Sequence, residues 1–260
     1  MKMRRSTALV GAAVLAVIGY AGAAQAAAPE AGTCSGGEIA SGTYSSLTVT
    51  GACSVPAGAE ITVLHNLTVE PGAVFDAQGA PSDVRIDGNV VAGRGSMFGL
   101  GCTAAHGCEE PGPYSNDSVG GNITLDHVFD AALNGVEVGG NVVSTGGGAG
   151  FIFPNGFVPF SVKDDTIHGN LVVRGLTTTW FGVIRSTVDG NVVLRDIHVD
   201  DPDGNEVVHD TIGKNLICLG NDPAPKFGDA VEEQGLPADY RYSTVGGRVI
   251  GQCGFVLQDS

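Results

Sequence analysis

A short alternation of apolar and polar residues recurs along the chain. Each copy reads apolar-x-Gly-Asn-apolar, with apolar residues three positions before the Asn, one after it and mostly three after it. Complete copies contain Asn89, Asn122, Asn141, Asn170 and Asn191, and looser copies contain Asn66, Asn215 and Arg248 at the same place. Apolar residues at alternate positions predict short strands that bury one face.

The spacing of the copies predicts how these strands are arranged. Successive copies are 23, 33, 19, 29, 21, 24 and 33 residues apart. A period near about 20 residues with a strand-like core is typical of a solenoid, whose coils bury their apolar faces together. Because parallel crossovers are nearly always right-handed and no hexapeptide period is present, we predict an all-β fold, a right-handed parallel β-helix. An antiparallel sandwich with Gly-Asn hairpin turns is the alternative.

The Gly-Asn pair predicts a corner in each coil. Gly permits a positive φ, and Asn tolerates a left-handed conformation. Stacked coils lie about 4.8 Å apart, so the amide of each Asn can hydrogen-bond to the Asn of the next coil. We therefore expect a ladder of Asn side chains along the molecule.

Alignment of the copies places other polar residues in columns. One expected column is a Thr ladder of Thr166, Thr187, Thr211 and Thr244. Others join Asp164, Arg185 and His209, and His168 with Asp189. Arg174 and Arg195 also share a column, and like charges on neighbouring strands need carboxylates nearby.

The chain divides into three expected segments. Basic residues at Lys2, Arg4 and Arg5, an apolar stretch and Ala24-Gln25-Ala26 predict a secretory signal over residues 1–26. The apolar stretch is too short to span a membrane. Residues 27–60 are expected to cap the solenoid, and residues 61–260 to form its coils and a disulfide-stapled end. We therefore expect a secreted, extracellular protein.

Charge narrows the choice of partners. Three of the 13 Lys and Arg residues lie in the predicted signal and all 28 Asp and Glu residues follow it, which leaves a net charge of −18. Such a charge repels nucleic acids and anionic membranes, so we expect neither a nucleic-acid partner nor membrane insertion. It also disfavours polyuronate substrates unless a cation bridges.

Six cysteines in an exported chain indicate disulfides, for which fifteen pairings are possible. Sequential pairing is the economical choice, because it pins the N-terminal segment and staples the last coil. The expected pairs are Cys34–Cys53, Cys102–Cys108 and Cys218–Cys253.

Three steps of the repeat are too long, and the extra residues can be placed at 94–116, 146–159 and 220–239. Placed alike, they would all lie on one side of the solenoid, as a binding face or as cover for the coils. The middle insertion is rich in Phe around a Pro-Asn-Gly turn, which predicts a hairpin. The candidate ligand-binding residues are Phe151, Phe153, Phe157, Phe160 and Trp180; the alternative is a flap packed on its own scaffold.

Candidate chemistry is sparse. Glycoside hydrolysis needs two carboxylates, and the weak candidates are Asp164, Asp165 and Asp189, with His168 as a helper. Charge columns on a solenoid are more often structural ion pairs. The acidic run at 200–206 offers Asp201, Asp203 and Asn205 as oxygen ligands for Ca²⁺, with a solvated turn as the alternative; we expect no other cofactor.

The C-terminal region carries a more specific motif. Cys218-x-Gly220-Asn221-x-Pro223-x-Pro225 is followed by Gly251-Gln252-Cys253. With the Gly-Asn repeats, this resembles secreted actinobacterial Gly-Asn-Val-repeat β-helix proteins. The resemblance implies the fold and no particular activity, and the Phe-rich insertion and the Cys102–Cys108 loop depart from it.

These observations favour a secreted or cell-surface, non-catalytic protein that binds a glycan, a protein partner or a cell-envelope component, or has a structural role in the envelope. The alternative is a carbohydrate-active β-helix enzyme, either a polysaccharide lyase or a glycoside hydrolase.

Overall fold

A computed structural model describes residues 28–103, 108, 112–148, 152–153, 156–157, 159–226 and 242–254. The predicted signal, residues 1–26, lies outside this part. The described residues form strands and turns without a helix, so the structure offers no helical membrane span there.

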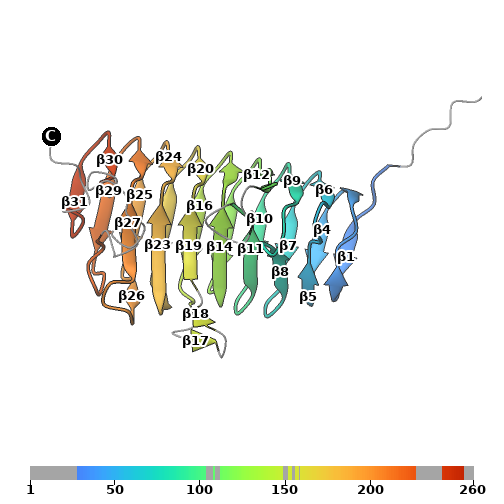
Figure 1. The fold of residues 1–260 in the computed structure, drawn as a ribbon, viewed down its shortest axis with the longest axis horizontal. Coiled ribbons are helices and arrows are strands. Elements are labelled where there is room, and N and C mark those ends of the chain that lie inside the picture. Colours follow the sequence, from blue (N-terminus) through green and yellow to red (C-terminus); the bar gives the residue numbers. More distant parts are fainter. Residues whose placement is uncertain are drawn as a thin grey trace, which may run out of the picture.

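Three long sheets run the length of the molecule, and all their strands pair in parallel (Figure 1). Sheet A contains β1 (Gly32–Cys34), β4 (Leu47–Val49), β7 (Leu67–Val69), β10 (Val90–Ala92), β13 (Ile123–Asp126), β16 (Val142–Thr145), β21 (Leu171–Arg174), β25 (Val192–Arg195), β29 (Leu216–Leu219) and β31 (Val249–Gly251). Sheet B contains β2 (Gly37–Glu38), β5 (Ala52–Ser54), β8 (Val74–Ala77), β11 (Met97–Leu100), β14 (Asp130–Asn134), β19 (Pro159–Lys163), β23 (Trp180–Ile184) and β27 (Asn205–Val208). Sheet C contains β3 (Gly42–Tyr44), β6 (Glu60–Val63), β9 (Asp83–Ile86), β12 (Asp117–Val119), β15 (Val136–Val138), β20 (Thr166–Ile167), β24 (Thr187–Val188), β28 (Thr211–Ile212) and β30 (Thr244–Val245).

The chain visits sheets A, B and C in turn, and each turn stacks on the one before it. This confirms the predicted parallel β-helix and excludes the antiparallel sandwich. The first coils already contain β1 to β5, within the segment 27–60 that we expected to be a cap. Two small sheets complete the fold: the antiparallel hairpin β17 (Ile152–Phe153) and β18 (Gly156–Phe157), and the parallel pair β22 (Thr177–Thr178) and β26 (His198–Val199).

Alternate residues of the strands fill a continuous core. In sheet A the inward positions are the apolar residues that follow each Asn in the repeat, such as Val90, Ile123 and Leu171, all fully buried. In sheet B, Phe75 and Phe98 stack with ring centroids 5.6 Å apart. The repeat therefore encodes the interior of the coil directly.

The Asn ladder is confirmed. Asn141 donates to the Oδ1 atom of Asn122 from both its backbone nitrogen, at 2.8 Å, and its side-chain nitrogen, at 2.9 Å. The same double contact joins Asn170 to Asn141 and Asn191 to Asn170. The Thr ladder is confirmed too, because Thr166, Thr187, Thr211 and Thr244 are register partners in sheet C.

The reason for Gly before each Asn differs from the one we expected. None of these glycines has a positive φ, and the Asn residues are not left-handed. Instead, a Cβ atom on Gly140 would lie 2.6 Å from Oδ1 of Asn122 and 2.7 Å from the carbonyl oxygen of Gly121. The coil approaches its neighbour closely at the Gly of each complete copy, whereas two of the looser copies have His65 and Lys214 at this place.

All three predicted disulfides are present: Cys34–Cys53, Cys102–Cys108 and Cys218–Cys253. The first joins β1 to β5, and the last joins β29 to the residues after β31, so both ends of the helix are cross-linked. Disulfides of this kind are typical of proteins in oxidising compartments.

The long steps do not share one corner, which corrects the expectation that they lie on one side. The first opens between β11 of sheet B and β12 of sheet C. The second opens between β16 of sheet A and β19 of sheet B, and it contains the β17–β18 hairpin (Figure 1). The third follows an isolated bridge from Lys226 to Glu206 of sheet B. Of the three insertions, the Phe-rich one is therefore the one that leaves the β-helix at the corner between sheets A and B.

Candidate functional site

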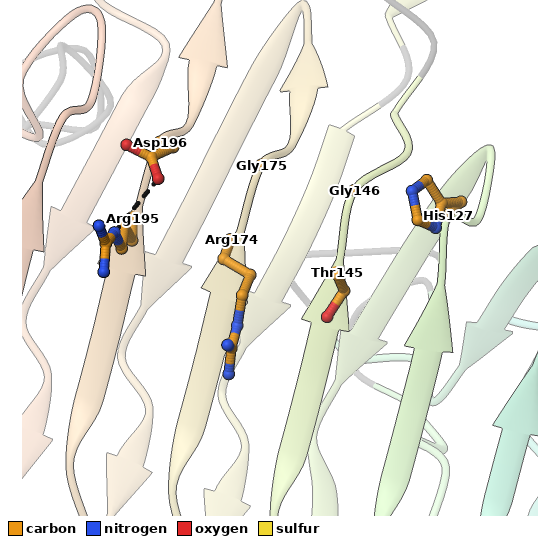
Figure 2. Close-up of a pocket in the computed structure, with 7 residues that line it drawn as sticks. All are labelled: His127, Thr145, Gly146, Arg174, Gly175, Arg195 and Asp196. Atoms are coloured by element: carbon orange, nitrogen blue, oxygen red, sulfur yellow. Dashed lines mark hydrogen bonds and ion pairs between the residues drawn. The ribbon is translucent and has the colours of Figure 1, made fainter.

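A surface depression of about 470 Å³ lies where the strands of sheet A end and turn toward sheet B (Figure 2). We call it the corner groove. It is lined by His127, Thr145, Gly146, Arg174, Gly175, Arg195 and Asp196. The Phe-rich insertion begins directly beside it, because Thr145 is the last residue of β16.

The stacking of coils builds the groove from two parallel columns. Thr145, Arg174 and Arg195 are register partners at the ends of β16, β21 and β25, and their side chains face solvent. The next residue in each coil is left-handed, with φ of 61° at Gly146, 66° at Gly175 and 52° at Asp196. Two of these corner residues lack a side chain, which leaves the surface hollow between His127 and Asp196.

Gly146 is required at its place for a second reason. A Cβ atom there would lie 2.5 Å from the ring of His127, on the preceding coil. His127 is itself left-handed, with φ of 50°, and its Nδ1 atom lies 2.7 Å from Oδ1 of Asp126. The imidazole is therefore held at one end of the groove.

The charges in the groove are unevenly paired. The Nε atom of Arg195 donates to Oδ2 of Asp196 at 3.2 Å, an exposed pair. Within the described part of the chain, the guanidinium of Arg174 has no ion pair. Figure 2 shows the Arg174 side chain extending back along the outer face of its strand, beside Arg195 on the next one. The carboxylate that the Arg column was expected to need is thus present for Arg195 only.

An apolar column runs alongside the arginines on the same outer face. Val143, Val172 and Val193 lie two residues before Thr145, Arg174 and Arg195, so their side chains also point outward. All three are half-buried. The face next to the groove therefore combines a strip of β-branched side chains with a strip of hydrogen-bond donors.

The catalytic candidates are not assembled into one site. Asp164 and Asp165 are consecutive but point to opposite sides of the coil. Arg185 holds Asp164 by two hydrogen bonds, of 2.6 Å and 2.7 Å, at the left-handed corner between sheets B and C. Asp165 is 1% exposed and accepts the backbone N–H of Val136 at 2.7 Å. Burial raises the pKa of Asp165 well above its usual value.

His168 and Asp189 lie in another column, at the exposed corner between sheets C and A. The Nδ1 atom of His168 contacts Oδ2 of Asp189 at 2.8 Å, as the alignment predicted, and its Nε2 atom lies 3.4 Å from Glu137. Hydrogen bonds to Asp189 and then to Glu137 raise the pKa of His168. The four candidate residues are thus divided among three environments.

Asp165 belongs to a buried column that sequence reasoning missed. Its members alternate between acid and hydroxyl one position before the Thr ladder: Asp165, Ser186, Asp210 and Ser243. Asp210 accepts the backbone N–H of Ser186 at 2.8 Å, and Asp117 accepts that of Val84 at 2.6 Å. These side chains satisfy backbone groups that the corner leaves without a sheet partner. The recurrent Asp/Ser-Thr pair was the signal that could have found them.

Only Phe160 and Trp180 among the aromatic candidates have side chains that the structure describes, and neither is exposed. Phe160 is 1% exposed and packs in the core against Phe181, with ring centroids 6.2 Å apart, so its predicted binding role is wrong. Trp180 is also buried. Phe151 and the side chains of Phe153 and Phe157 lie outside the described residues.

Trp180 has polar neighbours on the outer face of sheet B. The Lys163 ammonium lies 4.5 Å from the centroid of its ring, and its indole nitrogen donates to Glu206 at 3.3 Å. Burial, opposed by the charge of Glu206, lowers the pKa of Lys163 to about 8. This cluster is closed to solvent and offers no open ligand site.

The three calcium candidates, Asp201, Asp203 and Asn205, do not converge on one point in the acidic turn. The carboxylate of Asp203 pairs with Lys226, and Asp201 accepts the backbone N–H of Asp203 at 3.0 Å. Asn205 points into the interior and donates to the carbonyl oxygen of Pro223 at 2.8 Å. In the described part of the chain, no three His, Cys, Asp or Glu residues are placed to hold a metal ion.

No family model, curated protein or solved structure matches the chain in comparisons with known proteins.

Proposed function

We propose that this is a secreted or cell-surface β-helix protein that binds an extracellular glycan or cell-envelope component without catalysis, through the corner groove. The observation that carries the proposal is a pair of columns along the groove, with exposed donors at Thr145, Arg174 and Arg195 beside half-buried valines at 143, 172 and 193. Sugars are recognised by such a combination, because each ring has an apolar face and a polar rim.

Two further observations support the extracellular part of the proposal. The predicted signal over 1–26 directs the chain out of the cell, and three disulfides suit an oxidising compartment. The resemblance to secreted actinobacterial Gly-Asn-Val-repeat proteins agrees with such a location.

The experiment is a binding survey with the mature protein, residues 27–260. It measures retention on insoluble cell-wall material and affinity for a panel of neutral and acidic polysaccharides, with chain length of each polysaccharide followed over time. Binding with unchanged polymer length is the expected result. Loss of polymer length would contradict the non-catalytic role, and absence of binding to every sample would contradict the binding role.

The enzyme alternative has one specific observation in its favour. His168 is exposed between Asp189 and Glu137, in contact with both, and its pKa is raised by them. A protonated imidazole flanked by carboxylates can act as a general acid. If the survey detects depolymerisation, His168→Ala tests this alternative. If the protein is such an enzyme, this variant should lose the depolymerising activity and retain binding.

A further inference from the structure

We propose that the ligand of the corner groove is a linear acidic glycan that lies along the helix axis, with one of its anionic groups bridging Arg174 and Arg195. This inference rests on the proposed glycan-binding function and specifies the class of glycan and the residues that select it.

The positive charge of the Arg column is only partly compensated within the protein. Arg174 and Arg195 are register partners on neighbouring strands, about 4.8 Å apart at the backbone. Asp196 compensates only Arg195, and no carboxylate of the described residues pairs with Arg174. A carboxylate presented by a ligand can accept from both guanidinium groups, which bind planar oxyanions well.

The donor column runs along the axis of the β-helix. The donor column recurs once per coil, from Thr145 of β16 through Arg174 of β21 to Arg195 of β25, and its member on the coil before Thr145 is Asp126 of β13. This line runs across the strands and therefore along the axis of the helix. A linear polymer with its own regular repeat can make equivalent contacts on successive coils, whereas a small anion would use one step of the column only.

The apolar strip beside the arginines favours a glycan over a simple polyanion. Val143, Val172 and Val193 form a half-buried strip parallel to the cationic one, on the same face of sheet A. A sugar ring can place its apolar face on this strip and its carboxylate over the arginines. A flexible polyphosphate chain offers no apolar face to match it.

The net charge of −18 opposes the binding of an acidic ligand, but screening limits its effect at the groove. At physiological ionic strength the Debye length is about 8 Å, so exposed charges farther from the groove are largely screened. The charges nearest the two arginines then matter most: Asp196 lines the groove beside Arg195, while Asp126 lies in the same column two strands from Arg174, beyond Thr145. We therefore expect the groove to bind polyuronates, although the net charge of the whole chain disfavours them.

The test uses the mature protein with polygalacturonate and alginate as probes, in EDTA at physiological ionic strength so that no divalent cation bridges. Fully methyl-esterified polygalacturonate is the matched ligand control, since it has the same backbone without the charge. We expect the two polyuronates to bind and the esterified polymer to bind at least tenfold more weakly.

Single substitutions test whether Arg174, Arg195 and Asp196 are responsible for the dependence on ligand charge. Arg174→Gln and Arg195→Gln are each expected to weaken polyuronate binding about tenfold or more. Asp196→Asn removes the competing carboxylate, and Asn suits the left-handed backbone at this corner, so this variant is expected to bind more tightly. Arg85→Gln is the control, because Arg85 is exposed on sheet C and pairs with Asp87.

Several results would overturn the inference. Equal affinity of the wild type and Arg174→Gln would do so, as would equal affinity for the esterified polymer. Failure of both polyuronates to bind would reject the acidic ligand, while the proposed function would stand if neutral glycans or cell-wall material still bound. If nothing in the survey bound, both the inference and the proposed function would fail.

Discussion

At the residue scale, the repeat is explained by contacts between coils. In the five complete copies, the Asn accepts two hydrogen bonds from the next coil and so fixes the stacking, and the preceding Gly leaves room for the close approach. The sequence predicts the Asn ladder because its spacing is regular. It does not reveal the role of Gly, because a positive φ and a steric restriction both select the same residue.

Replacement of Gly140 by Ala is therefore expected to destabilise the fold by on the order of 1–3 kcal/mol, since the new methyl group would press on a backbone oxygen. Gly79→Ala is the control, because a Cβ atom there meets nothing within 4 Å and should change stability by less than about 0.5 kcal/mol. Chemical denaturation measures both. Equal stability of the two variants would argue against the steric explanation.

Removal of a ladder amide gives a second residue-scale prediction. Asn170→Ala leaves donors on the next coil without an acceptor and is expected to cost about 1–3 kcal/mol. The melting temperature of this variant and of Asn191→Ala should fall together. If neither melting temperature changes, the ladder does not contribute to stability.

The buried acids predict an unusual pH dependence. Burial raises the pKa of Asp117 to about 7, and that of Asp130 likewise. A folded-state pKa above the unfolded value means that the stabilisation is complete below about pH 4 and is lost as the pH rises toward 7. We expect the free energy of unfolding to fall between pH 4.5 and 7.5, by on the order of 1–4 kcal/mol for Asp117.

Asp117→Asn keeps an acceptor for the Val84 N–H and cannot ionise, so it should reduce this slope. Glu38→Gln, at an exposed acid, should leave the slope unchanged. Urea titrations at several pH values measure it. A stability that increases from pH 4.5 to 7.5 would contradict the account.

At the scale of elements, the strands could be predicted and the corners could not. Alternating apolar residues define the inward face of sheet A, and register follows from the Asn spacing. At the corner between sheets B and C, a single left-handed residue interrupts the alternation, so Asp164 faces out and Asp165 faces in. The catalytic hypothesis counted both carboxylates among the candidates for one site. The corner groove was missed because its hollow depends on the left-handed residues 146, 175 and 196, which no repeated motif marks.

The terminal disulfide gives a prediction for the last coil. Cys218 is buried in β29 and Cys253 follows β31, so the bond joins the end coil to the one before it. Replacement of both by Ala is expected to lower stability by about 3–4 kcal/mol, given the 35-residue separation. The expected loss should appear in chemical denaturation without reductant. Recovery of either thiol free in non-reducing peptide mapping of the wild type would refute the pairing.

At the scale of the whole molecule, an acidic solenoid carries two neighbouring arginines at the end of the strands of sheet A, in a column that continues as Thr145 on one side and Leu219 on the other. The coils supply a rigid row of equivalent positions, and only a few of these carry exposed, incompletely paired cations. The net charge of the chain indicates which ligands are repelled at long range, but the register of the coils determines where an anionic group can be held. The Arg174–Arg195 column was visible in the sequence, whereas its place beside a groove and an apolar strip required the structure.

The most direct test of the central claim is co-sedimentation of the mature protein with insoluble cell-wall polysaccharide, for the wild type, Arg174→Glu and Arg85→Glu. Both substitutions make the same change in net charge at exposed sites, but only Arg174 lies in the groove. The wild type and Arg85→Glu are expected to sediment with the polysaccharide, and Arg174→Glu is expected to stay in solution. Equal sedimentation of the two variants would contradict binding through the corner groove.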